Sequence, residues 1–277
     1  MSFIALLICI CLERFWDGVA DLRNYDWFVA YKGLLNQHLG DKSFWQGYVK
    51  MAGLILPILL VMLIVSLIFS AMLGGIGSVI FSVLILAYCI GPHNIYAEIK
   101  QCVAKNEDGS ARLVTEKAHA FFGTDPSLDD RAARLQLSQA ILTVANRRVF
   151  VMCFWFGVLG PLGALLYRLI ALCAEDDGLH AQAEWIQAVL DWPSARVLAL
   201  AYAITGNFMG VFPVFMKHAL DGIEKNGEVL KASTRGAFGI TDSNESTQDI
   251  DPRQASNLLD RALGAWVLVV LIFNIIY

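Results

Sequence analysis

The sequence predicts an all-α fold: a polytopic bundle of about five to six membrane-spanning helices with a helical cap on the cytoplasmic side. Of the 277 residues, 57% are hydrophobic and only 17% are charged, whereas soluble domains carry about 25% charged residues. Apolar segments of about 20 residues recur, which is the length that a helix needs to cross the hydrocarbon core. The chain is therefore expected to lie in a lipid bilayer as one membrane domain over residues 1–277.

Six apolar segments are the expected spans. The first is uninterrupted only from Ser2 to Leu12, about half the thickness of the hydrocarbon core, and is expected to continue to about residue 20. The sequence GGIG at 74–77 leaves room only for a tight helical hairpin between the second and third. In order, the expected spans are residues 2–20, 52–73, 76–90, 149–172, 197–215 and 262–277.

Basic residues predict how these spans are oriented. Segments 13–50, 97–148 and 217–261 carry five, eight and six Lys or Arg residues, whereas 74–75 and 173–195 carry none. Threading six spans places the basic segments on one side and the other two opposite, and the positive-inside rule makes the basic side cytoplasmic. Both termini then face outward. If the first segment only half inserts, the amino terminus lies inside and nothing else changes.

The cytoplasmic segment before residue 149 predicts an amphipathic helix. Asp125 is its expected N-cap and Pro126 its first helical residue. Apolar residues follow at helical spacing as far as Ala145, so this helix is expected to run directly into the fourth span. The stretch SARLVTEKAHAFFG before it predicts a second, shorter helix, and the polar stretch 241–252 predicts a flexible loop.

Glycine and proline interrupt the fourth span. Gly157, Gly160 and Gly163 recur every third residue, and Pro161 removes one helix hydrogen bond. The glycines permit close approach of a neighbouring helix, and the freed carbonyl must be satisfied by protein or by cavity water. A kinked, tightly packed helix is expected, and a ligand site at the kink stays open as a hypothesis. The sequence shows no internal repeat.

Several charged residues near the predicted bilayer are candidates for binding. Glu13 either lies at the cytoplasmic interface or points into the bundle and pairs with an arginine. Arg147 and Arg148 stand where the cytoplasmic helix meets the membrane, either as topology anchors or as a site for an anion, which suits the planar guanidinium. Arg168 follows Tyr167 near the outer interface, where it snorkels or faces the acidic connection after it.

Common motifs for nucleotide, metal and nucleic-acid binding are absent from the sequence. It contains no P-loop, no H-E-x-x-H and no G-x-S-x-G, and its six cysteines form no C-x-x-C pair. No cofactor, metal site or nucleic-acid partner is therefore expected. Gly206 and Gly210 have G-x-x-x-G spacing, which leaves open a helix-packing seam or a homodimer seam.

Three stretches together resemble the AmpE family: LLICICLER at 6–14, FWFGVLGPLGALLYRL at 154–169 and LDWPSARVLALAYAITGNF at 190–208. Proteins of that family are inner-membrane proteins linked to the induction of β-lactamase in Gram-negative bacteria. The wider superfamily includes CobD (CbiB), the adenosylcobinamide-phosphate synthase of cobalamin assembly. The resemblance covers most of the chain.

The resemblance implies site residues where the motifs match. Gly163-Ala164 and Tyr167-Arg168 match a GA-x-x-YR signature shared with the synthases. The motif ahead of the fifth span is matched by Asp191, Trp192 and Arg196, although Pro193 here follows the tryptophan directly.

Two departures separate this chain from the synthases. Asn146 takes the position of their EN-x-x-DG segment, but the acidic residue and the Asp-Gly pair are missing from ANRRVF. The Asn-Thr-Leu-Asp-like run after Arg168 is replaced by LIALCAEDD. Both losses remove candidate carboxylates for activating an amide-forming substrate or for holding Mg²⁺.

The resemblance thus implies a regulatory or sensory inner-membrane protein that acts in the response to β-lactams and cell-wall turnover. A polar pocket within the bundle, framed by the kink of the fourth span, is expected to bind an anionic small molecule or a cell-wall-derived ligand. A membrane enzyme related to the synthase and a transporter of a small cell-wall fragment are the alternatives. The expected binding residues are Glu13, Asn146, Arg147, Arg148, Tyr167, Arg168, Asp191 and Arg196.

Overall fold

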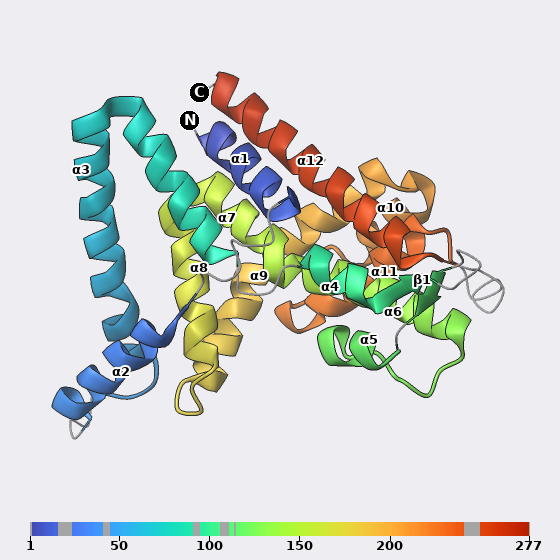
Figure 1. Cartoon of the computed structure of the whole chain (residues 1–277), viewed down its shortest axis with the longest axis horizontal. Helices are drawn as coiled ribbons and strands as arrows, with labels where there is room; N and C mark the ends of the chain where they lie inside the picture. The colour runs from blue at the N-terminus through green and yellow to red at the C-terminus, as the bar shows by residue number, and fades with distance from the viewer. Residues whose placement is uncertain are drawn as a thin grey trace. The chain divides into compact units, whose positions relative to one another are not determined.

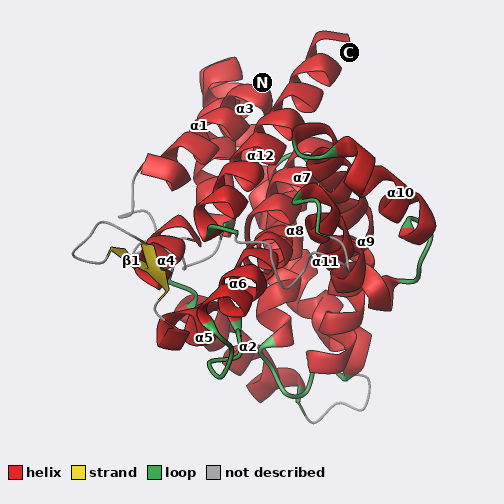
Figure 2. Ribbon diagram, turned by 90° about the vertical axis from the view of Figure 1, so that its right-hand side faces the viewer, coloured by secondary structure: helices red, strands yellow, loops and turns green. Residues whose placement is uncertain are grey.

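The structure is a computed structural model of the chain that describes residues 2–15, 24–40, 45–90, 95–105, 111–113, 115–240 and 250–276. Across these residues the regular structure is helical apart from two three-residue strands, β1 (Val103–Lys105) and β2 (Ala111–Leu113), which pair antiparallel (Figure 2). Three of the described helices are long and apolar enough to cross a membrane: Gly47–Cys89, Asp130–Leu159 and Pro252–Ile272. The predicted all-α membrane fold is confirmed.

The described chain divides into two compact units. Unit 1 comprises residues 1–92, 152–190 and 270–277, and unit 2 comprises residues 93–151 and 191–269. The prediction of a single membrane domain over the whole chain stays a prediction.

Unit 1 is built around a long helical hairpin. Its elements are α1 (Ser2–Phe15), α2 (Asp26–Leu39), α3 (Gly47–Cys89), α7 (Val151–Leu159), α8 (Pro161–Ala174), the first part of α9 (His180–Thr205) and the end of α12 (Pro252–Ile276). Gly74 has φ 58° and ψ −140°, so α3 turns there into two arms against which α1 and α8 pack (Figure 1). The tight hairpin predicted from GGIG is confirmed.

The expected span at 149–172 is two helices. α7 ends at Leu159, and α8 begins at Pro161. Gly160 between them has φ 72°, a backbone region that only glycine adopts freely. A Cβ on Gly163 would lie 2.5 Å from the Trp155 carbonyl oxygen, so α8 folds back along α7. The predicted break is confirmed, and it is a reversal rather than a kink.

Both hairpins of unit 1 use the same five-residue device. LGGIG at 73–77 and LGPLG at 159–163 each pair a turn glycine of positive φ with a second glycine three residues later. In each case the second glycine faces the carbonyl eight residues earlier, which is that of Phe69 for Gly77 and that of Trp155 for Gly163. This local recurrence was missed in the sequence because the flanking residues differ.

The second hairpin returns to the end of unit 1 from which α3 starts. Beyond the end of α8, the Asp176 carboxylate lies 2.9 Å from Lys32 Nζ and 4.0 Å from Lys50 Nζ. The six-span threading put segments 13–50 and 173–195 on opposite sides, and this contact shows that it is wrong. The physical reason is the reversal at Gly160, where the chain turns back.

Unit 2 contains the remaining helices and helical turns. They are α4 (Ile95–Cys102), α5 (Thr115–Phe122), α6 (Asp130–Ala145), the π-helical turn η2 (Asn146–Phe150), the rest of α9, α10 (Phe208–His218), the 3₁₀ turn η3 (Ile223–Lys225), α11 (Asn226–Ala237) and most of α12. Since Asp130–Leu159 is continuous, the amphipathic helix runs into the apolar segment as predicted.

The start of α6 differs from the prediction. Asp129 is the N-cap, and its carboxylate accepts a hydrogen bond from the Ala132 N–H at 3.2 Å. The carboxylate of Asp125 instead accepts from the N–H and the hydroxyl of Ser127. The carboxylate of Asp125 is therefore engaged in a local turn and does not cap the helix, which begins four residues after Pro126.

The expected span at 197–215 is also interrupted. α9 ends at Thr205, and Asn207 caps α10 by accepting from the Gly210 N–H at 3.2 Å. A Cβ on Gly236 of α11 would lie 2.5 Å from the Gly210 carbonyl oxygen. The G-x-x-x-G face at Gly210 is thus used to pack α10 on α11 within one chain, and the predicted homodimer stays a prediction.

Candidate functional site

The π-helical turn η2 sets the directions of three consecutive polar side chains. A π-turn inserts one residue into the helical repeat and is frequent at functional sites. Asn146 and Arg147 both contact α9, whereas Arg148 contacts α4 and the end of α5. The three polar residues that the sequence analysis grouped together therefore contact two separate parts of unit 2.

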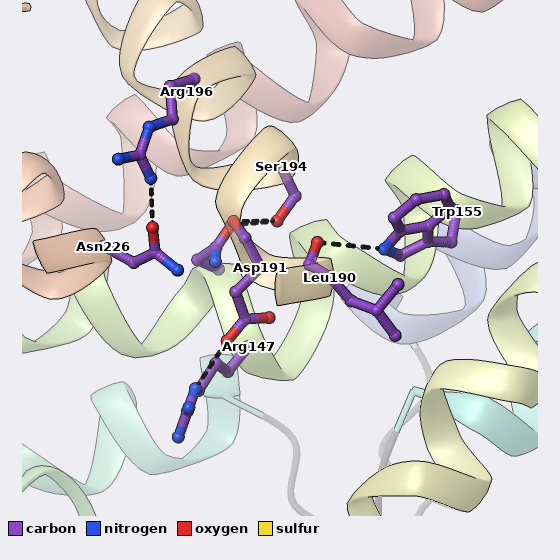
Figure 3. Close-up of polar contacts among 8 residues, drawn as sticks. Arg147, Trp155, Leu190, Asp191, Ser194, Arg196 and Asn226 are labelled. Atoms are coloured by element: carbon purple, nitrogen blue, oxygen red, sulfur yellow. Dashed lines mark hydrogen bonds and ion pairs between the residues drawn. The ribbon is translucent and has the colours of Figure 1, made fainter. Parts of the chain in front are cut away.

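Arg147 forms an ion pair with Asp191 (Figure 3). Nε of Arg147 lies 2.8 Å from the Asp191 carboxylate, whose side chain is 4% exposed, while the Arg147 side chain is 50% exposed. A buried carboxylate loses its hydration, so it requires a close partner charge. Removing the arginine would leave that charge without its ion-pair partner in the interior.

A hydrogen bond from a serine hydroxyl joins α9 to η2 next to this ion pair. The Ser194 hydroxyl lies 3.3 Å from Oδ1 of Asn146 and 3.0 Å from the carbonyl of Asp191. Ser194 and Asn146 are both buried. Pro193 brings no N–H to the helix interior, which removes one bond from α9 at this point. The cluster of Asn146, Arg147, Asp191 and Ser194 is called the junction cluster below.

Arg196 acts as a structural clamp. Its Nε donates to the Ala219 carbonyl at 3.2 Å and its Nη2 to the Asp221 carbonyl at 2.8 Å. Nη1 donates to Oδ1 of Asn226 and to the Trp192 carbonyl. Every guanidinium nitrogen is thus engaged in holding the turn before α11 against α9.

The other predicted residues fall elsewhere. Arg148 pairs with the buried Glu98 and donates to the Phe121 carbonyl at 3.0 Å, which fixes α4 and α5 to η2. Arg168 belongs to unit 1, where its Cζ lies 4.3 Å from the ring centre of Tyr25. Tyr167 is buried, and the Glu13 side chain lies outside the described residues.

Sequence reasoning named Asp191, the partner of Arg147, but it missed Ser194, Glu98 and Asn226. Ser194 stands three residues after Asp191 in DWPSAR, so helical spacing could have indicated it. Glu98 is the only acidic residue of IYAEIK, a signal that also was available. Asn226 carries no such signal, because its contact with Arg196 depends on how two distant helices pack.

The junction cluster lies where the chain passes from one unit to the other. The divisions fall after Val151 and after Leu190. On the unit 2 side the two passages are joined by the Arg147–Asp191 pair and by Ser194. On the unit 1 side Nε1 of Trp155 donates to the Leu190 carbonyl at 3.2 Å (Figure 3). Within each unit, side-chain hydrogen bonds thus join the two helices close to the point where the chain leaves that unit.

Comparisons with known proteins agree with the resemblance. The model of a family described as "Regulatory signalling modulator protein AmpE" matches residues 1–277. A curated relative, cobalamin biosynthesis protein CobD of Chromobacterium violaceum, is 24% identical over 172 residues, which are 59% of this chain and 55% of the relative. The chain thus spans little more than half the length of that relative. No solved structure matches the chain.

Proposed function

The chain belongs to the AmpE family, and on that basis we propose that it modulates β-lactamase induction from the bacterial inner membrane in response to cell-wall turnover. The family match supports signalling modulation. The link to β-lactamase, the inner membrane and the stimulus are parts of the proposal.

The observation that carries the proposal is the ion pair between Arg147 and Asp191. It joins two helices that each have a part in both units, so its making or breaking changes how firmly the two passages are held together. A signalling protein needs such an element with two states that a ligand can bias.

The pair also indicates how an anionic ligand would act. Half of the Arg147 side chain is exposed, whereas the Asp191 carboxylate is enclosed. An incoming phosphate or carboxylate reaches Arg147 from the exposed side and competes with Asp191 for the guanidinium. Weakening of the pair would loosen α9 from η2, which is the proposed signalling step.

The test is β-lactamase activity with and without a β-lactam inducer in a host that lacks the gene. The host is complemented with wild type, Arg147→Gln, Asp191→Asn or the control Asp130→Asn, and membrane content is measured by immunoblot. Asp130 forms an exposed pair with Arg134 on α6, far more solvated than Asp191. We expect altered induction in the deletion strain, restored by wild type and by the control but not by the two junction variants.

Two results would contradict the proposal. Unchanged induction in the deletion strain would remove the link to β-lactamase. Restoration by both junction variants, at wild-type protein levels, would show that the pair has no part in signalling.

A second candidate rests on the similarity to the CobD protein. An activity related to cobalamin assembly would appear as a growth defect of the deletion strain on medium that demands cobalamin synthesis. Normal growth there, together with altered induction, would favour the modulator.

A further inference from the structure

A face of α12 changes from polar to apolar along its length. Gln254, Asn257 and Arg261 lie at helical spacing on one face, and no charged residue follows Arg261 in the chain. The same face continues into Leu268 and Ile272, which are both more than half exposed. Within a helix that is apolar enough to cross a membrane, Arg261 therefore marks the level of the bilayer boundary.

A recess opens in unit 2 at that level. It has a volume of about 460 Å³ and is bounded by the three polar side chains of α12, by Gly206 after α9, and by Ala237 and Phe238 at the end of α11. Gly206 is packed closely, since a Cβ there would meet the Ala237 Cβ and Leu258 at 3.3 Å. At Gly206 the recess therefore lies directly against side chains of α11 and α12.

The recess is positively charged. None of its described lining residues is acidic, and Arg261 places a guanidinium beside the amides of Gln254 and Asn257. The neighbouring Asp260 instead accepts a hydrogen bond from the Tyr96 hydroxyl at 2.7 Å. One guanidinium and two amides can together donate several hydrogen bonds to a phosphate.

The residues on either side of Gly206 in the chain are apolar and exposed. Ile204 is 72% exposed and Met209 is 82% exposed, and Phe208 stacks on Phe212 at 4.9 Å on the outer face of α10. The opposite face of α10 is fixed to α11 at Gly210. At 11 residues, or about 16 Å, α10 is too short to cross a bilayer. A short helix with such a face lies in the plane of the interface, with its apolar side toward the acyl chains.

We propose that this recess binds the phosphate of an anionic phospholipid, whose acyl chains cover Ile204, Met209 and the apolar face of α12. A free phosphate ion shares the chemistry of the headgroup. The exposed apolar residues that flank Gly206 in the chain assign the site to the lipid. Binding there would hold α10 at the membrane surface.

The experiment uses the full-length protein in neutral detergent, with native mass spectrometry to count bound phosphatidylglycerol and phosphatidylcholine. The variants are Arg261→Gln and the control Arg253→Gln, an exposed arginine of α12 that does not line the recess. We expect wild type and Arg253→Gln to prefer phosphatidylglycerol by about tenfold, which corresponds to about 1.4 kcal/mol. Arg261→Gln should lose this preference.

Three results would overturn the proposal. Equal binding of the two lipids by wild type would show that the recess does not select an anionic headgroup. An unchanged preference in Arg261→Gln would place the headgroup elsewhere. Complete loss of bound phosphatidylglycerol when inorganic phosphate is added would assign the recess to a free anion. Elution of all variants at the wild-type volume in size exclusion shows that the fold is kept.

Discussion

The glycine pair of the second hairpin gives a prediction that separates two kinds of strain. In Gly163→Ala the new Cβ would lie 2.5 Å from the Trp155 carbonyl oxygen and 2.7 Å from the Leu159 Cβ, where ordinary contacts are 3.4–4 Å. α7 and α8 must therefore separate, and overpacking of this kind costs about 1–3 kcal/mol. In Gly160→Ala no atom lies within 4 Å, so the cost comes only from φ 72° and is about 1–2 kcal/mol.

The control is Gly264→Ala in α12, where there is open space and a helical backbone. Alanine should stabilise the protein there by about 0.4–1 kcal/mol. The assay is thermal unfolding in detergent, followed by the loss of the folded peak in fluorescence-detected size exclusion. With about 2–4 °C for each kcal/mol, we expect the midpoint of Gly163→Ala to fall by about 2–12 °C.

The outcome that would refute this reasoning is a Gly163→Ala protein as stable as Gly264→Ala. Such a result would mean that α8 does not fold back closely on α7. If only Gly160→Ala were destabilised, the turn would exist but the close contact of the arms would not.

Three further predictions concern topology and titration. We expect an impermeant maleimide, in a cysteine-free background, to label Gly178→Cys and Gln37→Cys from one side of the membrane and Met72→Cys from the other. Labelling of Gly178→Cys from the same side as Met72→Cys would instead support the six-span threading. Burial raises the pKa of Asp176, but the hydrogen bonds from Lys32 and Gly178 and the charges of Lys32 and Lys50 outweigh it, so the pKa lies below its usual 3.8. The ionised Asp176 therefore stabilises the folded state above pH 3.8, and this stabilisation is lost as the pH falls below that value. When the thermal unfolding midpoint is measured at decreasing pH, it should fall less in Asp176→Asn than in wild type. Burial, with the nearby Glu98 carboxylate, raises the pKa of the Cys102 thiol to about 11. The thiol should therefore resist alkylation by iodoacetamide at pH 8 until the protein is unfolded. Rapid alkylation of Cys102 in the folded protein would contradict this burial.

The sequence could predict features that depend on neighbouring residues. GGIG and GPLG announce breaks because glycine and proline act on their own backbone, and both breaks are present at Gly74 and Gly160. The run from α6 into α7 was predictable for the same reason, since its apolar spacing is continuous.

Features that depend on distant partners could not be predicted. Hydropathy does not tell a kink from a reversal, so the return of α8 to Lys32 and Lys50 required the structure. Equally, the sequence grouped the arginines by charge, whereas packing gave Arg147, Arg148 and Arg196 three different acceptors. The junction cluster was predicted only as far as Asn146, Arg147 and Asp191.

The reversal at Gly160 has a consequence for the order in which the protein is assembled. α8 has 14 residues, or about 21 Å, and carries Arg168 in its middle, so it is not suited to enter the membrane as an independent span. What receives α8 is α3, together with the Tyr25 ring that covers Arg168. Since both receiving elements precede α8 in the chain, synthesis from the amino terminus delivers them first. The second hairpin thus inserts into a partner that is already in place, and a defect in α3 would be felt at α8 during biogenesis, before any ligand is met.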